Sequence, residues 1–187
     1  MYYPSQDNIF DNFPVIELDN IRLRKISPEE DYQKFFQYVN SPMVAKYLSM
    51  DDLPKDLEGA KKELYYWSHI FDYRHSFYWA IALKDSNEII GTCGFNYWNR
   101  SQGRAEISYD LDYNHWNKGI TTKAIKAITN FGLHTMQVKR IQATVALDNN
   151  ASMRVLEKAG FSQESILRKY GILQEESRDF YMYAKFD

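Results

Sequence analysis

The stretch HWNKGITTKAI, residues 115–125, lies between a predicted strand and a predicted helix. The strand AEISYDLDY precedes it, and Ile120, Ala124, Ile128 and Phe131 form the apolar stripe of the helix that follows. Gly, Ile and Thr are weak helix formers, so helix propensity does not explain this helix start. A strand that enters a helix through a glycine turn exposes N–H groups where the helix dipole favours negative charge. The stretch therefore predicts an anion site, with an ordinary strand-to-helix turn as the alternative.

Individual residues of this stretch suit an anion. Gly119 allows a positive φ and a close approach of the backbone to a ligand, and Thr121 and Thr122 add hydroxyl donors. Lys118 adds a positive charge. The glycine spacing is too short for a dinucleotide-binding fingerprint, and GITTK is not a Walker loop.

Strands and helices alternate along the rest of the chain, without internal repeats or a Gly/Ser-rich linker. Apolar periodicity predicts strands at 21–26, 76–85, 88–98, 105–113, 140–147, 162–172 and 178–186. It predicts helices from Pro28, where Ser27 and Glu30 suggest a capping box, over 57–71, from Ile120, and over 151–159 before Gly160. This order predicts an α/β (α+β) fold with a mixed, mostly antiparallel central sheet of about seven strands and helices on both faces.

Length and composition restrict the kind of protein. The 187 residues are enough for one well-packed domain, which we place at 18–187 behind an N-terminal extension at 1–17. A net charge of -2 with mixed signs disfavours a nucleic-acid partner. We expect no membrane partner and a cytoplasmic location, because no signal peptide or long apolar run is present. The single cysteine, Cys93, lies in the apolar segment IIGTCGF and is expected to be a buried small residue rather than a nucleophile.

A second stretch, LDNNASMRVLEKAGF at 147–161, directly follows a predicted strand. Asn149 or Asn150 can cap its helix, and taken alone it predicts only a capped helix. Together, however, the two helix starts resemble the GCN5-related N-acetyltransferase (GNAT) superfamily, and in particular its Rim-type branch of ribosomal-protein N-terminal acetyltransferases. The resemblance runs from about Ile16 to the C-terminus and includes the segments IRLRKIS, AEISYDL and DFYMYAKF.

The resemblance implies a GNAT-like fold and transfer of acetyl from acetyl-CoA, with no metal, to a primary amine. The pyrophosphate would be held at Asn117–Thr122, and pantetheine would lie between the splayed strands AEISYDL and RIQATVAL. Trp116 and Thr121 depart from the loop pattern of the family. The residues implied in binding acetyl-CoA are Leu111, Asn117, Lys118, Gly119, Ile120, Thr121, Thr122, Asn149 and Ser152.

Three residues are candidates for the chemistry. Ser152 matches the serine of the family's Asn-x-Ala-Ser motif and could protonate the departing thiolate, with Asn149 orienting it; helix capping is the alternative. Glu106 is the best acidic candidate for the amine, through water; the alternative is an exposed strand carboxylate paired with Arg104 or a lysine. A backbone N–H between Tyr109 and Leu111 would stabilise the oxyanion.

The acceptor and the assembly stay open at this point. An α-amine with a pKa of about 7.7–8.0 needs a weaker base than a lysine with a pKa of about 10.4, which favours a protein N-terminal α-amine or a small-molecule amine. One rival function is a non-catalytic acetyl-CoA-binding or sensor module. Another is a metal site at His69, Asp72 and His75, whose spacing fits a helix poorly. The chain is expected to be a monomer or a homodimer.

Overall fold

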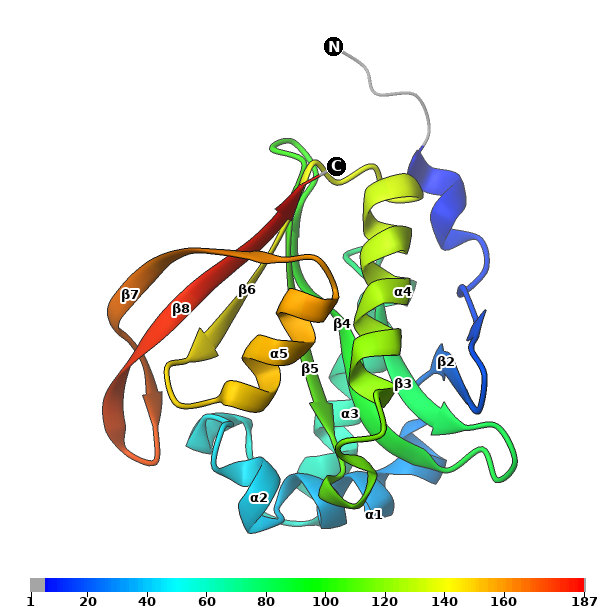
Figure 1. The fold of residues 1–187 in the computed structure, drawn as a ribbon. Coiled ribbons are helices and arrows are strands. Elements are labelled where there is room, and N and C mark those ends of the chain that lie inside the picture. The colour runs from blue at the N-terminus through cyan, green and yellow to red at the C-terminus, as the bar shows by residue number, and fades with distance from the viewer. Residues whose placement is uncertain (1–5, 187) are drawn as a thin grey trace.

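A computed structural model of the chain describes residues 6–186 (Figure 1). The helices are α1 (Pro28–Val39), α2 (Pro42–Ala45), α3 (Leu57–Asp72), α4 (Ile120–His134) and α5 (Asn150–Lys158), and short 3-10 helices lie at Gln6–Phe10, Met50–Asp52 and Tyr113–His115. The strands are β1 (Ile16–Glu17), β2 (Ile21–Lys25), β3 (Tyr78–Leu83), β4 (Ile89–Asn99), β5 (Arg104–Leu111), β6 (Arg140–Ala146), β7 (Ser162–Leu173) and β8 (Glu176–Phe186). The predicted elements are therefore present, and α2 and β1 are additions that the periodicity did not indicate.

The strands form one sheet in the order β1-β2-β3-β4-β5-β6-β8-β7. The described sheet has eight strands instead of about seven, because Ile16 and Glu17 pair with Leu23 and Arg22 at its edge. Neighbours are antiparallel except β5 and β6, which α4 connects. The predicted mixed, mostly antiparallel sheet is confirmed.

The parallel pair β5 and β6 is short. Only Arg104–Glu106 pair with Arg140–Gln142, after which β5 continues along β4 and β6 continues along β8. Figure 1 shows the two strands diverging toward the end of the molecule that carries the start of α4. The expected splay is confirmed, and it opens the sheet between Ile107–Leu111 and Ala143–Ala146.

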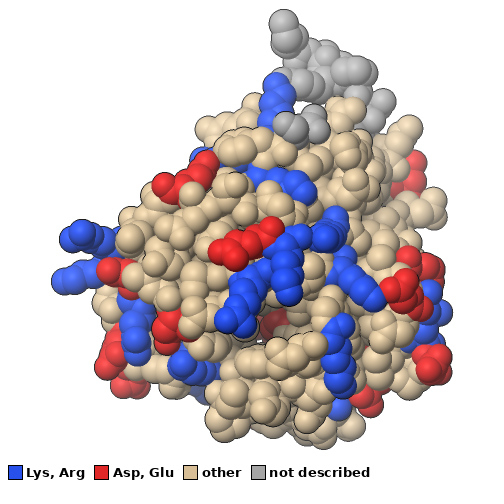
Figure 2. All heavy atoms as spheres, viewed as in Figure 1, with Lys and Arg blue, Asp and Glu red and all other residues tan. Residues whose placement is uncertain are grey.

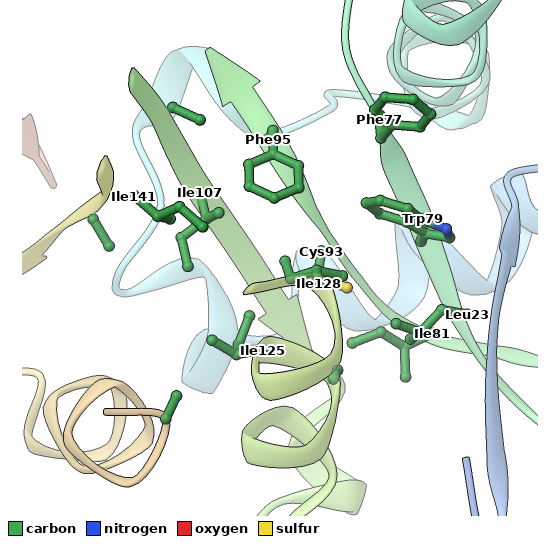
Figure 3. Close-up of a cluster of buried hydrophobic side chains, with 14 of the residues drawn as sticks. Leu23, Phe77, Trp79, Ile81, Cys93, Phe95, Ile107, Ile125, Ile128 and Ile141 are labelled. Carbon is green, nitrogen blue, oxygen red and sulfur yellow. The ribbon is translucent and has the colours of Figure 1, made fainter. Parts of the chain in front are cut away.

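Helices cover both faces of the sheet, as predicted. On one face, α4 and α5 bury Ile125, Ile128 and Leu156 against the strands. Figure 3 shows part of this cluster, with Cys93 and Phe95 beneath the helix. On the other face, α1 and α3 bury a second cluster against Tyr78, Ala80 and Ile89, including Phe35, Val39, Ala60 and Leu64. Burial of these side chains from two layers holds the diverging strands in place.

Two helix ends were predicted from local sequence, the start of α1 and the end of α5, and only the second prediction is correct. The capping box at α1 is wrong, because the Ser27 side chain makes no cap hydrogen bond and Asp31, not Glu30, accepts the Ser27 N–H at 2.8 Å. Arg24 also donates two hydrogen bonds to the Asp31 carboxylate, at 2.7 and 2.8 Å. These bonds hold Asp31, the residue after Glu30, in the position where it accepts the Ser27 N–H. The stop after α5 is correct, since Gly160 has φ +87°.

The N-terminal segment packs on the sheet where the structure describes it. Phe10 is buried and stacks on Phe77 at 4.7 Å between ring centroids, and Phe13 meets Phe71 edge-on at 5.0 Å. Residues 1–5 of the predicted extension lie outside the described residues. Among the described helices, none has the length and apolar character needed to span a bilayer.

Candidate functional site

A cavity of about 690 Å³ lies where β5 and β6 diverge. It reaches α4 and α5 on one face of the sheet and the segment after α2 on the other. The described residues that line it are Val44, Tyr47–Ser49, Asn96, Glu106–Leu111, His115–Asn117, Gly119–Thr122, Ala143–Ala146, Asn149, Ala151, Ser152, Arg154, Val155, Lys158, Gly171–Leu173 and Phe180. Segments far apart in the sequence therefore meet around one opening, which the sheet topology creates.

The start of α4 forms one wall of the cavity. Gly119 precedes the helix with φ +72°, and a Cβ built there meets nothing within 4 Å. No side chain caps the helix, so its first N–H groups are left for a ligand or water. Ile120, Thr121 and Thr122 line the cavity, as does Asn117 with φ +62°. The geometry fits the predicted anion site.

Lys118 is the exception among the predicted residues of this loop. Its Nζ donates to the Asn114 carbonyl at 2.9 Å, and it does not line the cavity. Trp116, which departs from the family pattern, donates its indole N–H to the Leu111 carbonyl at 2.9 Å and so ties the loop to the end of β5. His115 also lines the cavity, and burial together with the nearby Lys118 charge lowers its pKa.

Ser152 lies in the first turn of α5, with its hydroxyl 2.7 Å from that of Tyr109 on β5. The Tyr109 hydroxyl is also 3.3 Å from the Ser152 carbonyl, and burial raises the pKa of Tyr109. Asn149 is the N-cap of the helix, because its side-chain oxygen accepts the Ser152 N–H at 3.1 Å. The capping alternative therefore holds for Asn149, while the Ser152 hydroxyl faces Tyr109 across the cavity wall.

The backbone of β5 also faces the cavity. Asp112 N–H donates to the Ile90 carbonyl at 2.7 Å, on the side of β4. In an antiparallel pair, every second residue directs its backbone N–H and C=O to the same neighbouring strand. Asp112 faces β4, so the backbone groups of Tyr109 and Leu111 point away from β4. That is the side from which β6 has diverged. The N–H groups predicted as oxyanion donors are thus directed into the opening.

Glu106 lies where the two strands separate, and it lines the cavity. Its carboxylate accepts a hydrogen bond from Gln142 Nε2 of β6 at 2.9 Å. The partner is therefore the facing glutamine of the parallel strand and not Arg104, the alternative drawn from the sequence. A neutral donor leaves the charge of Glu106 available to the cavity.

Several lining residues were not found from the sequence. Arg154 and Lys158 on α5 repeat at i and i+4, a spacing that places both on one face of a helix and could have indicated them. Asp110 on β5 gave no signal because its partners, Tyr38 and Thr92, are distant in the sequence. Val44 lies in α2 and Tyr47–Ser49 follow that helix, which no periodic pattern revealed.

The other sequence candidates lie elsewhere. Asp72 pairs with Lys25 at 2.7 Å, and His69 Nδ1 lies 2.8 Å from the Tyr65 carbonyl. Within residues 6–186, no three His, Cys, Asp or Glu side chains are arranged to hold a metal ion. Cys93 is fully buried, and burial raises its thiol pKa. Cys93 is therefore a buried small residue, as expected.

Two diverging parallel strands lie beside a helix that starts after an uncapped glycine, and together they form an open site with free backbone groups. Residues 20–162 match the acetyltransferase (GNAT) domain family, which covers most of the chain. The chain belongs to the GNAT family and is an acetyl-CoA-dependent N-acetyltransferase. It is 32% identical to the N-acetyltransferase p20 of Bacillus licheniformis over 166 residues, which cover 89% of this chain and 92% of that relative.

Solved structures agree on the fold. The ribosomal L7/L12 α-N-protein acetyltransferase RimL, in complex with coenzyme A, superposes with a TM-score of 0.84 at 20% identity, covering 92% of this chain and 98% of that one. The ribosomal-protein-S5-alanine acetyltransferase of Vibrio fischeri superposes with a TM-score of 0.81 at 22% identity, covering 92% and 96%. These two structures share the fold of this chain over most of its length.

Proposed function

We propose that this protein transfers the acetyl group of acetyl-CoA directly to a primary amine, with both substrates in the cavity between β5 and β6. The single observation that carries the proposal is the cavity itself, which joins the start of α4 to the opposite face of the sheet. One face can receive the acetyl donor while the acceptor enters from the other.

In this proposal, the pyrophosphate lies at Asn117–Thr122. The supporting features are the positive φ of Gly119, the open space around it and the uncapped first turn of α4. Arg154 and Lys158 add positive charge on α5, which suits the remaining phosphate. The outward-facing groups of Tyr109 and Leu111 would hydrogen-bond the amide groups of pantetheine. Lys118 is not assigned to this contact, because it does not line the cavity and its amine donates to the Asn114 carbonyl.

The chemistry has three steps that this chain can assist. The free amine attacks the acetyl carbon, and Glu106 accepts the proton that the amine loses, through a water molecule. A backbone N–H of β5 stabilises the oxyanion. The C–S bond then breaks, and the sulfur leaves as a thiol by taking a proton, for which Ser152 is positioned by its bond to Tyr109.

The test of this proposal is acetylation of a panel of amines with acetyl-CoA, comparing peptides with free α-amines, lysine peptides with blocked N-termini, and small amines. We expect turnover with at least one class and release of one free thiol for each amine acetylated. A protein that binds acetyl-CoA and acetylates none of these amines would be the sensor module instead.

A further inference from the structure

Charged side chains around the cavity are divided between the two faces of the sheet. Of the described residues that line it, Arg154 and Lys158 are basic, and Glu106 and Asp110 are acidic. Both basic residues belong to α5, on the face that α4 also covers. Figure 2 shows Lys and Arg side chains gathered around a hollow on this face of the molecule.

The acidic residues lie on the opposite face. Side chains alternate along a strand, and Ile107 and Leu111 pack in the cluster under α4. Ser108 and Asp110 therefore point the other way, where their partners are Tyr78 at 2.8 Å and Tyr38 of α1 at 2.8 Å. Glu106 is two residues before Ser108 on the same strand, so its side chain points to the same face of the sheet. The acceptor side of the cavity thus carries both carboxylates.

No basic side chain balances Asp110 among its described contacts. Its hydrogen bonds come from the Tyr38 hydroxyl, the Thr92 N–H at 3.0 Å and the Thr92 hydroxyl at 2.6 Å, all neutral donors. Burial raises the pKa of Asp110, and the negative charge of Glu63 on α3 raises it further. Lys46, beside α2, pairs with Asp148 at 3.4 Å and does not line the cavity.

We propose that the cavity selects amine acceptors that carry no carboxylate or phosphate beside the amine. An ammonium ion arriving on this face is attracted by Glu106, and by Asp110 as well above the folded pKa of that carboxyl. An anionic group beside the amine meets no basic side chain among the described residues that line this side. The inference rests on the proposed function, whose acceptor it defines. Free amino acids and nucleotides are disfavoured, and amines with neutral or cationic surroundings are favoured.

The expected discrimination follows from the separation of the charges. Two unit charges about 10 Å apart, at an effective dielectric constant of about 20, change a binding equilibrium on the order of tenfold. Glu106 lines the opening and is bonded to the neutral Gln142 side chain, so a carboxylate adjacent to the amine meets this repulsion where the amine approaches Glu106.

L-Alaninol and L-alanine make a matched pair for the test, because they differ only in a hydroxymethyl group in place of the carboxylate and their amines have similar basicity. Binding of each to the CoA-loaded protein is followed by NMR titration, and kcat/KM is measured with acetyl-CoA. We expect alaninol to be preferred by roughly tenfold or more in both measurements. The binding arm does not depend on turnover.

Asp110→Asn tests the source of the preference. It keeps the Tyr38 and Thr92 N–H bonds at Oδ1 and removes the charge that Asp110 carries above its folded pKa. Measured above that pH, it should reduce the preference for alaninol several-fold. Asp85→Asn, on the exposed turn after β3, is the matched control and should leave it unchanged. Equal or tighter binding of alanine by the wild-type protein would overturn the inference, as would an unaltered preference in Asp110→Asn. Selective binding without acetylation would refute the proposed function and leave the inference in place.

Discussion

At the scale of single residues, the proposed mechanism depends on a pair of hydroxyl groups. Ser152 and Tyr109 lie 2.7 Å apart, and either could donate to the other. A phenol is ordinarily more acidic than an alkyl hydroxyl and is then the better donor, although burial raises the pKa of Tyr109 and reduces this difference. When Tyr109 donates to Ser152 Oγ, the serine proton is left free to point into the cavity. Tyr109 is then a positioning residue that acts through Ser152.

Ser152→Ala should lower kcat by roughly tenfold or more with little change in the KM for acetyl-CoA, because general acid catalysis is typically worth 10² to 10⁴-fold and water replaces part of it. Tyr109→Phe should give a smaller loss, and the double variant should be no slower than Ser152→Ala. Steady-state kinetics of the three variants check this.

The control is Tyr183→Phe. Tyr183 on β8 donates its hydroxyl to Glu157 of α5, the helix that also carries Ser152, at 3.3 Å, and its loss should leave kcat at the wild-type value. A full kcat in Ser152→Ala would leave Ser152 as a structural residue. Additive losses in the double variant would mean that Tyr109 acts on the substrate itself.

Asp110 gives the stability of the protein a definite dependence on pH. Its pKa is raised by burial, so the folded state binds more protons than the unfolded state above the unfolded pKa of about 3.9. The stability that this group contributes is present below that pH and is lost as pH rises through the folded pKa.

Asp110→Asn does not titrate, so its stability relative to the wild type should rise with pH from about 4 and level off above the folded pKa. The rise should be about 1.36 kcal/mol for each pH unit that separates the folded pKa from the unfolded one. Urea unfolding of both proteins from pH 4 to 8 measures the difference, and parallel curves would contradict it.

At the scale of elements, we propose that the start of α4 binds the pyrophosphate of the donor. A helix terminus that lacks a side-chain cap presents N–H groups in the direction of its positive dipole. Gly119 keeps this approach open, because nothing lies within 4 Å of the position a Cβ would take. Trp116 fixes the preceding loop to β5, which aims the helix start at the gap between the strands.

Gly119→Glu should weaken CoA binding by well over tenfold, because it adds a negative charge where contacts with an anion are worth about 0.3 to 2 kcal/mol each. Calorimetry with CoA measures the change. Gly119→Gln is the matched control for size and for the positive φ, and its smaller loss separates the charge from the backbone strain. Unchanged affinity in Gly119→Glu would remove the pyrophosphate from this loop.

Elements with a strong period were predictable from the sequence, and the parts of the site built by contact between distant segments were not. The α4 stripe and the two helix starts needed only local spacing, and Gly119 and Ser152 followed from them. Glu106 was predicted as a candidate for the chemistry, but its hydrogen bond to Gln142 could not be predicted, because it depends on how β5 and β6 pair. The Ser27 capping box failed because Arg24, on the preceding strand, holds Asp31 in its place. Asp110 joins α1 to β4 through tertiary contacts for which local sequence has no signal.

At the scale of the whole molecule, the arrangement favours reaction within a ternary complex. The cavity passes from one face of the sheet to the other, so the donor and the acceptor can be present together. The one thiol of the chain is sealed in the core between α4 and the sheet, where Figure 3 shows it. Burial disfavours its thiolate, which makes an acetyl-cysteine intermediate unfavourable.

Initial-rate plots at several acceptor concentrations should therefore intersect, as expected when both substrates bind before either product leaves. Cys93→Ala should retain most of the activity and lose some stability to the small cavity it creates. Parallel plots, or acetylated Cys93 trapped in the absence of an acceptor, would instead make Cys93 the nucleophile.

The divergence of β5 and β6 has a consequence for what counts as the complete fold. Past Glu106, the inner edge of β5 has no strand beside it, and the groups of Tyr109 and Leu111 point toward an opening inside the molecule. Proteins normally cover or pair such an edge. Here an extended ligand with amide groups of its own can take the place that a neighbouring strand would occupy. On the proposed function, a bound substrate would complete the hydrogen bonding of the sheet at this edge, and its departure would leave the edge open again.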